Sequence, residues 1–124
     1  MVNQDIFYNA IVHDITAIRG DTIQFNFQIM GLRGSRPNTV VFKAKEHYDD
    51  ETPVFVCEVG NGVTYQSYDS TTDTITYAVR VAPTKTQSLD LARYYYSLDI
   101  TANDDVVTLL KGRLILDYDV RKGV

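Results

Sequence analysis

The sequence predicts an all-β fold, an antiparallel β-sandwich of seven or eight strands that forms a single domain over the 124 residues. Three observations support this prediction. Several segments alternate between apolar and polar residues, and clusters of turn residues separate them at strand-length intervals. The chain also carries 9 tyrosines and 5 phenylalanines but no tryptophan, an aromatic mixture suited to pleated strands.

The first 68 residues contain five expected strands. Three of them are weaker candidates: residues 11–18, residues 54–59, which follow Pro53, and residues 63–68. The alternation is clear in residues 22–30 and in Thr39–Lys45. Side chains expected on the buried faces of these two strands are Ile23, Phe25, Phe27, Ile29, Val40, Phe42 and Ala44.

The second half contains three more expected strands. Residues 73–81 alternate strictly, and residues 93–101 do the same. Residues 84–91 fit a short helical turn that Thr86 would cap. Near the C-terminus a long strand stays in phase through Gly112, which predicts a bulge or bend there. Its inward residues would be Leu110, Leu114, Leu116, Tyr118 and Val120.

Composition excludes several classes of protein. The net charge of −4 provides no basic stripe, so we expect no nucleic-acid partner. No apolar run reaches the length of a membrane span, and the first residues lack the pattern of a signal peptide. We therefore expect no membrane partner and folding in a cytoplasm. The single cysteine, Cys57, allows no intramolecular disulfide and no zinc spacing.

The sequence predicts no catalytic residue, no bound metal and no cofactor. His13 and His47 lack the neighbouring nucleophile or carboxylate that an acid–base pair requires. The Arg19-Gly20-Asp21 tripeptide is what a tight turn before a strand needs. Acidic loop residues could bind calcium, but solvated turns explain them better. They are Asp49, Asp50, Glu51, Asp69, Asp73, Asp104 and Asp105.

Residues 90–96 resemble the D-x-A-x-Y-x-C signature of immunoglobulin domains. Asp90, Ala92 and Tyr94 match this signature, and Tyr96 stands in place of the cysteine. The resemblance implies an immunoglobulin-like architecture with a tyrosine corner. In that corner, Tyr94 packs inward and its hydroxyl binds a backbone group upstream.

A second resemblance covers most of the chain, from Ile15 to Val120. The order of its segments is similar to that of the N-terminal domain of tailed-phage baseplate upper proteins. These segments are a turn at residues 19–22, a strand at residues 40–45, an acidic loop at residues 48–50 and a closing segment at residues 111–114. Related small β-sandwich proteins occur in phage and prophage virions. The resemblance implies a non-enzymatic structural protein of a virion, an adaptor-type module of the baseplate or tail.

The expected partners are other virion proteins and further copies of this chain. Two alternatives remain open: a head-decoration or head-fibre anchoring protein, and a carbohydrate- or receptor-binding module. An N-terminal arm at residues 1–10 could dock on a neighbour. Aromatic residues expected to take part in such contacts are Phe7, Tyr8 and Tyr48, with the outward tyrosines Tyr65, Tyr68 and Tyr95.

Overall fold

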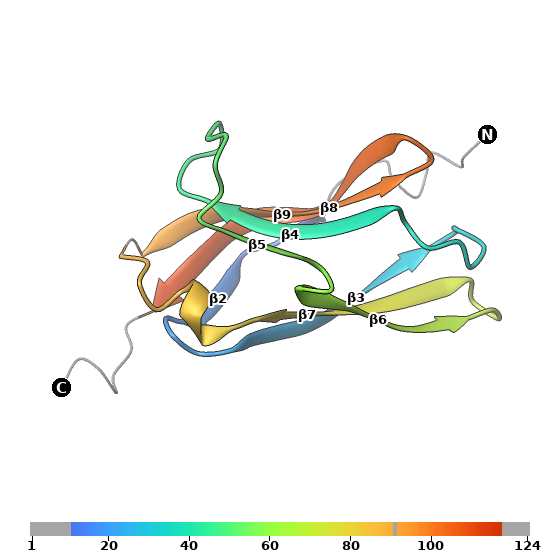
Figure 1. Cartoon of the computed structure of the whole chain (residues 1–124), viewed down its shortest axis with the longest axis horizontal. Helices are drawn as coiled ribbons and strands as arrows, with labels where there is room; N and C mark the ends of the chain where they lie inside the picture. The colour runs from blue at the N-terminus through green and yellow to red at the C-terminus, as the bar shows by residue number, and fades with distance from the viewer. Residues whose placement is uncertain (1–10, 91, 118–124) are drawn as a thin grey trace.

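The computed structural model describes residues 11–90 and 92–117 of the chain. In this part the fold is all-β, and its strands form one mixed sheet that curls into a half-barrel (Figure 1). The strands are β1 (Ile11–Val12), β2 (Ile15–Ile18), β3 (Ile23–Met30), β4 (Thr39–Lys45), β5 (Phe55–Val59), β6 (Gly62–Asp69), β7 (Thr74–Val81), β8 (Arg93–Ala102) and β9 (Asp105–Asp117).

The curled sheet has two layers. In Figure 1, β9, β8, β4 and β5 lie above β6, β7 and β3, and β1 and β2 pair with β9. The layers are joined at β5 and β6, where only Glu58 pairs with Gly62 and Val59 with Val63. Gly62 permits this junction, because its φ is 98° and a Cβ there would lie 2.9 Å from the carbonyl oxygen of Arg80.

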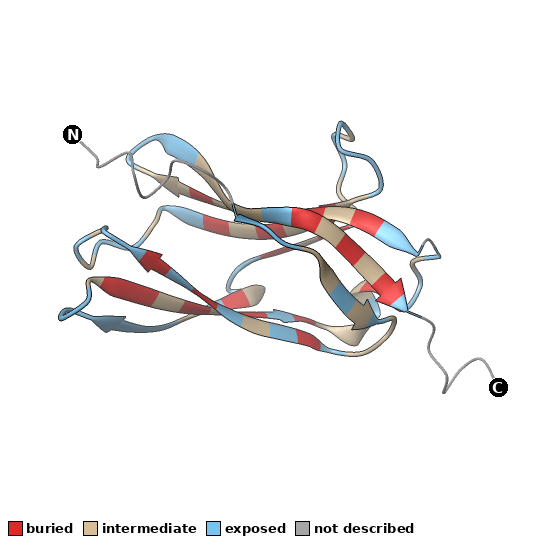
Figure 2. Cartoon of the chain, turned by 180° about the vertical axis from the view of Figure 1, so that it is seen from behind, coloured by how far each residue is buried: buried red, intermediate tan, exposed pale blue. Residues whose placement is uncertain are grey.

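The alternation expected from the sequence sets the buried faces. β3 pairs with β7 without a register shift, from Ile23 opposite Val81 to Met30 opposite Thr74. Figure 2 shows the resulting alternation of buried and exposed residues along the strands. The predicted inward residues of β4 are all buried, whereas Phe25 in β3 is half-buried. Every second residue is likewise buried in β7, from Ile75 to Val81, and in β8, from Tyr94 to Ile100. These side chains fill the space between the two layers.

The N-terminal strand differs from the prediction. The expected strand at residues 11–18 is two short strands, β1 and β2, interrupted at His13 and Asp14. Both run parallel to β9, as β5 does to β6, so the sheet is mixed and not purely antiparallel. The register of β9 continues across the break, because Ile11 faces Leu110 and Ile15 faces Leu114.

The C-terminal strand also differs. It begins at Asp105, earlier than expected, because Asn103 and Asp104 both have positive φ and form a tight turn after β8. The register shift lies opposite Leu98 and Asp99 and leaves Leu109 unpaired, so the predicted bulge at Gly112 is wrong. Leu114 and Leu116 are buried as expected, whereas Tyr118 and Val120 lie outside the described residues.

The expected helical turn is shorter than predicted. A single 3₁₀ turn covers Pro83–Lys85, and Thr86 lies at its C-terminal end and not at its start. Thr86 is fully buried, and its hydroxyl oxygen accepts a hydrogen bond from the backbone N–H of Gly20 at 2.9 Å. Thr86 therefore ties this turn to the turn that precedes β3. Leu91, at the end of the predicted turn, lies outside the described residues.

Candidate interaction surfaces

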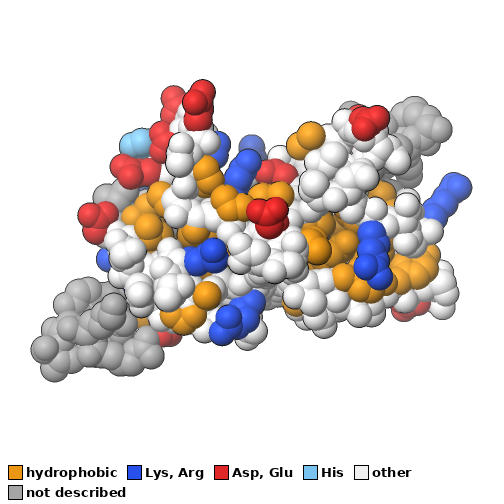
Figure 3. All heavy atoms as spheres, in the orientation of Figure 1, with side chains coloured by type: hydrophobic (Ala, Val, Ile, Leu, Met, Phe, Trp, Pro, Cys, Tyr) orange, Lys and Arg blue, Asp and Glu red, His pale blue; other side chains and the backbone are white. Residues whose placement is uncertain are grey.

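The outer face of β4, β8 and β9 carries a pair of stacked tyrosines. The loop between β4 and β5 projects from the sheet (Figure 1), and Tyr48 belongs to this loop. Tyr95 lies between the buried Tyr94 and Tyr96 on β8, so it belongs to the outer face of that strand. The ring centroids of Tyr48 and Tyr95 are 4.1 Å apart, with 29° between the ring planes. Acidic side chains gather on the same projecting loop (Figure 3). We call this pair, with the neighbouring Lys43, Lys45 and Lys111, the tyrosine–lysine face.

Asp99 organises the polar groups of this face. Its carboxylate accepts hydrogen bonds from the hydroxyls of Ser97 at 3.0 Å and Thr108 at 2.8 Å. It also lies 3.7 Å from the ammonium group of Lys43. These contacts join neighbouring strands β4, β8 and β9 on one surface. Asp99 therefore holds the side chains of Lys43, Ser97 and Thr108 in place next to the tyrosine pair.

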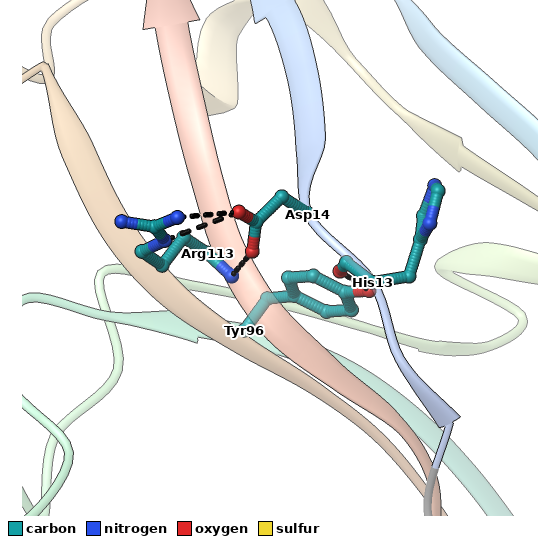
Figure 4. Close-up of polar contacts among 4 residues, drawn as sticks. All are labelled: His13, Asp14, Tyr96 and Arg113. Carbon is teal, nitrogen blue, oxygen red and sulfur yellow. Dashed lines mark hydrogen bonds and ion pairs between the residues drawn. The ribbon is translucent and has the colours of Figure 1, made fainter.

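A second polar cluster secures β1 and β2 to β9 (Figure 4). The Asp14 carboxylate accepts a hydrogen bond from the Arg113 backbone N–H at 3.0 Å and two from its guanidinium, at 2.7 and 3.2 Å. The side-chain bond to Arg113, followed by the backbone bond, lowers the pKa of Asp14 below its ordinary value. Because this carboxylate takes the place of a backbone acceptor, the strand is interrupted here.

Tyr96 of β8 contacts the same interruption between β1 and β2. Its hydroxyl donates to the His13 carbonyl at 2.6 Å, and burial raises its pKa, so the hydroxyl keeps its proton. Gly112 lies beside this contact, and a Cβ there would overlap the His13 carbonyl. The glycine therefore allows close approach of the chain and does not mark a bulge. The imidazole of His13 points away from the cluster (Figure 4).

The expectation that Tyr65 points outward is wrong. Tyr65 lies opposite Tyr77 in the sheet, and the two rings meet edge to face with centroids 5.7 Å apart. The guanidinium of Arg36 covers the Tyr65 ring at 3.5 Å. The register shift after Tyr65 leaves Gln66 unpaired and brings Tyr68, at the exposed end of the same strand, opposite Ile75. There the Tyr68 hydroxyl donates to Asp73 at 3.1 Å.

An apolar groove opens between the two layers, beside β3. It has a volume of about 440 Å³ and is lined by residues 26–30 of β3, residues 108–110 of β9, Ile11 and Leu98. Within the described residues, β3 is the terminal strand of the sheet. None of its residues is charged. The groove therefore exposes an unpaired, uncharged strand edge above apolar side chains.

The six interaction residues predicted from the sequence do not form one surface. Tyr48 and Tyr95 lie together, Tyr65 and Tyr68 belong to the other layer, and Phe7 and Tyr8 lie outside the described residues. Tyr94 is buried, and its role as a tyrosine corner stays a prediction. The sequence analysis missed the groove and the three lysines, since only the pairing of distant strands brings these residues together.

The residues considered for chemistry lie apart. His13 lies at the interruption between β1 and β2, and His47 lies on the projecting loop, 3.6 Å from Glu46; both are exposed. Cys57 is buried, and burial raises its pKa. In residues 11–90 and 92–117, no three side chains of His, Cys, Asp or Glu gather to hold a metal ion. The same residues contain no helix long and apolar enough to cross a membrane.

No protein-family model matches this chain, and no curated protein is similar to it. The likeness to baseplate upper proteins therefore rests on the residue pattern alone.

Proposed function

We propose that this chain is a non-enzymatic structural protein of a tailed-phage or prophage virion, an adaptor-type module of the baseplate or tail. Its partners would be other virion proteins and copies of itself, and its location would be the virion. The observation that carries the proposal is the free edge of β3 above the apolar groove. Free strand edges pair readily with strands of other chains, and apolar grooves add the burial that makes such pairing stable.

The strand order supports the finer proposal of an immunoglobulin-like sandwich. In that fold, strands B, E and D form one layer and C, F and G the other, with further strands beside C in variable-type domains. Here β3, β7 and β6 correspond to the first layer, and β4, β8 and β9 to the second, with β5 beside β4. Such a sandwich leaves its edges and end loops free for contacts with neighbours.

Light scattering over a wide concentration range tests assembly through this edge. We expect the wild-type chain to associate, and the Gln28→Lys variant to remain monomeric, because a lysine on an edge strand opposes pairing. Gln28 is exposed in the lining of the groove. Thr76→Lys is the matched control, since Thr76 is half-buried on β7 and pairs with Gln28 of β3 on one side and Ser67 of β6 on the other. Equal association by all three proteins would contradict the role of the β3 edge.

Mass spectrometry of purified particles tests the place in a virion. Particles from the bacterial strain that carries the gene should contain the chain in a constant ratio to the major structural proteins. Its absence from intact particles would overturn the virion proposal, whatever the chain does in isolation. Labelling the chain in particles by electron microscopy would separate the baseplate or tail from the head, where a decoration or fibre-anchoring protein would lie.

A further inference from the structure

A small pocket lies within the tyrosine–lysine face, on the outer side of β4, β8 and β9. Its volume is about 210 Å³. The lining residues that matter here are Lys45, Tyr48, Tyr95, Ser97, Thr108 and Lys111. We propose that this pocket binds an acidic saccharide, meaning a sugar ring that carries a carboxylate or phosphate group. Of its lining residues, only Thr108 also lines the β3 groove, and the inference does not depend on the proposed role in a virion.

The tyrosine pair supplies the platform for a sugar ring. Tyr48 is 67% exposed, yet its ring is held by stacking on Tyr95. A fixed, exposed aromatic ring offers a flat apolar surface to the C–H face of a pyranose. Because Tyr95 belongs to strand β8, the platform is supported by the sheet and not by the loop alone.

The lysines supply the charge that selects an acidic ligand. Lys43 already lies beside Asp99, whereas Lys45 and Lys111 have no ion-pair partner among the residues that the structure describes. Both flank the pocket, in a chain whose net charge is −4. Ammonium groups in this arrangement can donate charge-assisted hydrogen bonds to a carboxylate or phosphate.

The two hydroxyls of the pocket act as acceptors. Ser97 and Thr108 both donate their protons to Asp99, which leaves the lone pairs of their oxygens available. Such oxygens can accept hydrogen bonds from the hydroxyl groups of a sugar. An acidic peptide has no comparable set of hydroxyl donors and needs no flat aromatic platform. The combination of platform, acceptors and ammonium groups therefore favours a saccharide.

Titration followed by ¹⁵N–¹H NMR spectroscopy tests this inference with three probes: galacturonic acid, galactose and inorganic phosphate. We expect galacturonic acid to shift the amide signals around the pocket at millimolar concentrations, with galactose binding about tenfold more weakly, as the loss of one charge-assisted contact implies. Added salt should weaken the binding of galacturonic acid and leave that of galactose unchanged, because salt screens exposed charges.

Three variants separate the contributions. Lys45→Gln with Lys111→Gln should remove the preference for galacturonic acid over galactose. Tyr48→Ala should weaken both sugars, whereas Tyr48→Phe should retain binding because the ring remains. Arg80→Gln is the control, since it removes one positive charge from an exposed position in the other layer. Unchanged thermal unfolding would show that each variant is folded.

Three results would overturn the inference. Absence of pocket shifts with either sugar would do so directly. Equal binding of phosphate and galacturonic acid, unaffected by Tyr48→Ala, would mean that the lysines attract any anion. Binding of poly-glutamate without binding of either sugar would assign the face to an acidic protein partner.

Discussion

At the scale of single residues, two contacts decide how the N-terminal strands meet β9. Gly112 leaves room for the His13 carbonyl, and Asp14 binds both the backbone and the side chain of Arg113. Neither contact follows from local sequence, because Asp14 and Arg113 are 99 positions apart. A glycine in a strand can mark either a bulge or a close approach of another part of the chain, and the sequence does not distinguish the two. The bulge predicted at Gly112 was therefore wrong.

Gly112→Ala should loosen β1 and β2 from β9. The added methyl group would push against the His13 carbonyl and reduce the free energy of unfolding by about 1–3 kcal/mol, as overpacking does. Amide exchange should quicken at His13, whose N–H donates to the Lys111 carbonyl. Gly60→Ala is the control for backbone strain without steric overlap, because Gly60 has a φ of 90° and a Cβ there meets nothing within 4 Å. If exchange at His13 quickened equally in both variants, the steric explanation would be wrong.

The Asp14 carboxyl should titrate below its ordinary pKa of 3.8, because Arg113 stabilises its charged form. A lower pKa in the folded than in the unfolded chain means that this stabilisation is present at neutral pH and is lost as the pH falls through the folded pKa. The difference in unfolding free energy between wild type and Asp14→Asn should therefore shrink in acid.

Carboxyl ¹³C NMR gives the pKa of Asp14 directly. In Arg113→Gln, the pKa of Asp14 should rise towards 3.8, since the guanidinium is its main partner. A stability difference between wild type and Asp14→Asn that did not vary with pH would show that the charge of Asp14 is not what holds the cluster.

At the scale of elements, alternation predicted the strands well wherever pairing is regular. The β3 strand and its partner β7 have the expected inward faces because they pair without a shift over their whole length. Bulges escaped prediction, since the unpaired residues are Gln66 and Leu109, which carry no local turn signal. Tyr65 shares the inward phase of the buried Val63, and the shift at Gln66 then brings Tyr68 opposite Ile75. The groove and the tyrosine–lysine face depend on strand order, which alternation does not determine.

Asp104→Gly should stabilise the β8–β9 hairpin. Asp104 has a φ of 69° and follows Asn103 at 51°, the conformation in which an Asn-Gly pair is favoured. We expect the free energy of unfolding in urea to rise by about 0.5–1 kcal/mol, because glycine adopts positive φ without strain. Asp105→Gly, one residue later in β9, should instead destabilise, since glycine weakens a strand. Destabilisation by both variants would argue against strain at Asp104.

At the scale of the whole molecule, one curled sheet offers separate surfaces for different partners. The edge of β3 and the apolar groove face one opening of the half-barrel. The tyrosine–lysine face lies on the outer side of the other layer, and its pocket shares only Thr108 with the groove, so a neighbour at the groove leaves the tyrosine pair and the lysines free. We therefore expect assembly and saccharide binding to be independent of each other.

Removal of residues 1–10 should abolish assembly and leave the fold intact, if these residues form an arm that docks on a neighbour. Light scattering would show a monomer, while circular dichroism and thermal unfolding would match the full chain. Ile11 lines the groove, so the deletion ends beside the proposed contact. Unchanged association of the shortened chain would remove residues 1–10 from the interface and leave the β3 edge as the proposed contact.

The parallel pairing of β1 and β2 with β9 also constrains the time course of folding. Residues 15–18 find their partners only when residues 114–117 have been synthesised, 99 positions later. At about 5–20 residues per second, the ribosome takes about 5–20 s to make this stretch. During this interval the N-terminal strands of a nascent chain have no partner in β9. A folding step that depends on such distant pairing is slow, and chaperone binding to residues 11–18 would shield them until β9 emerges.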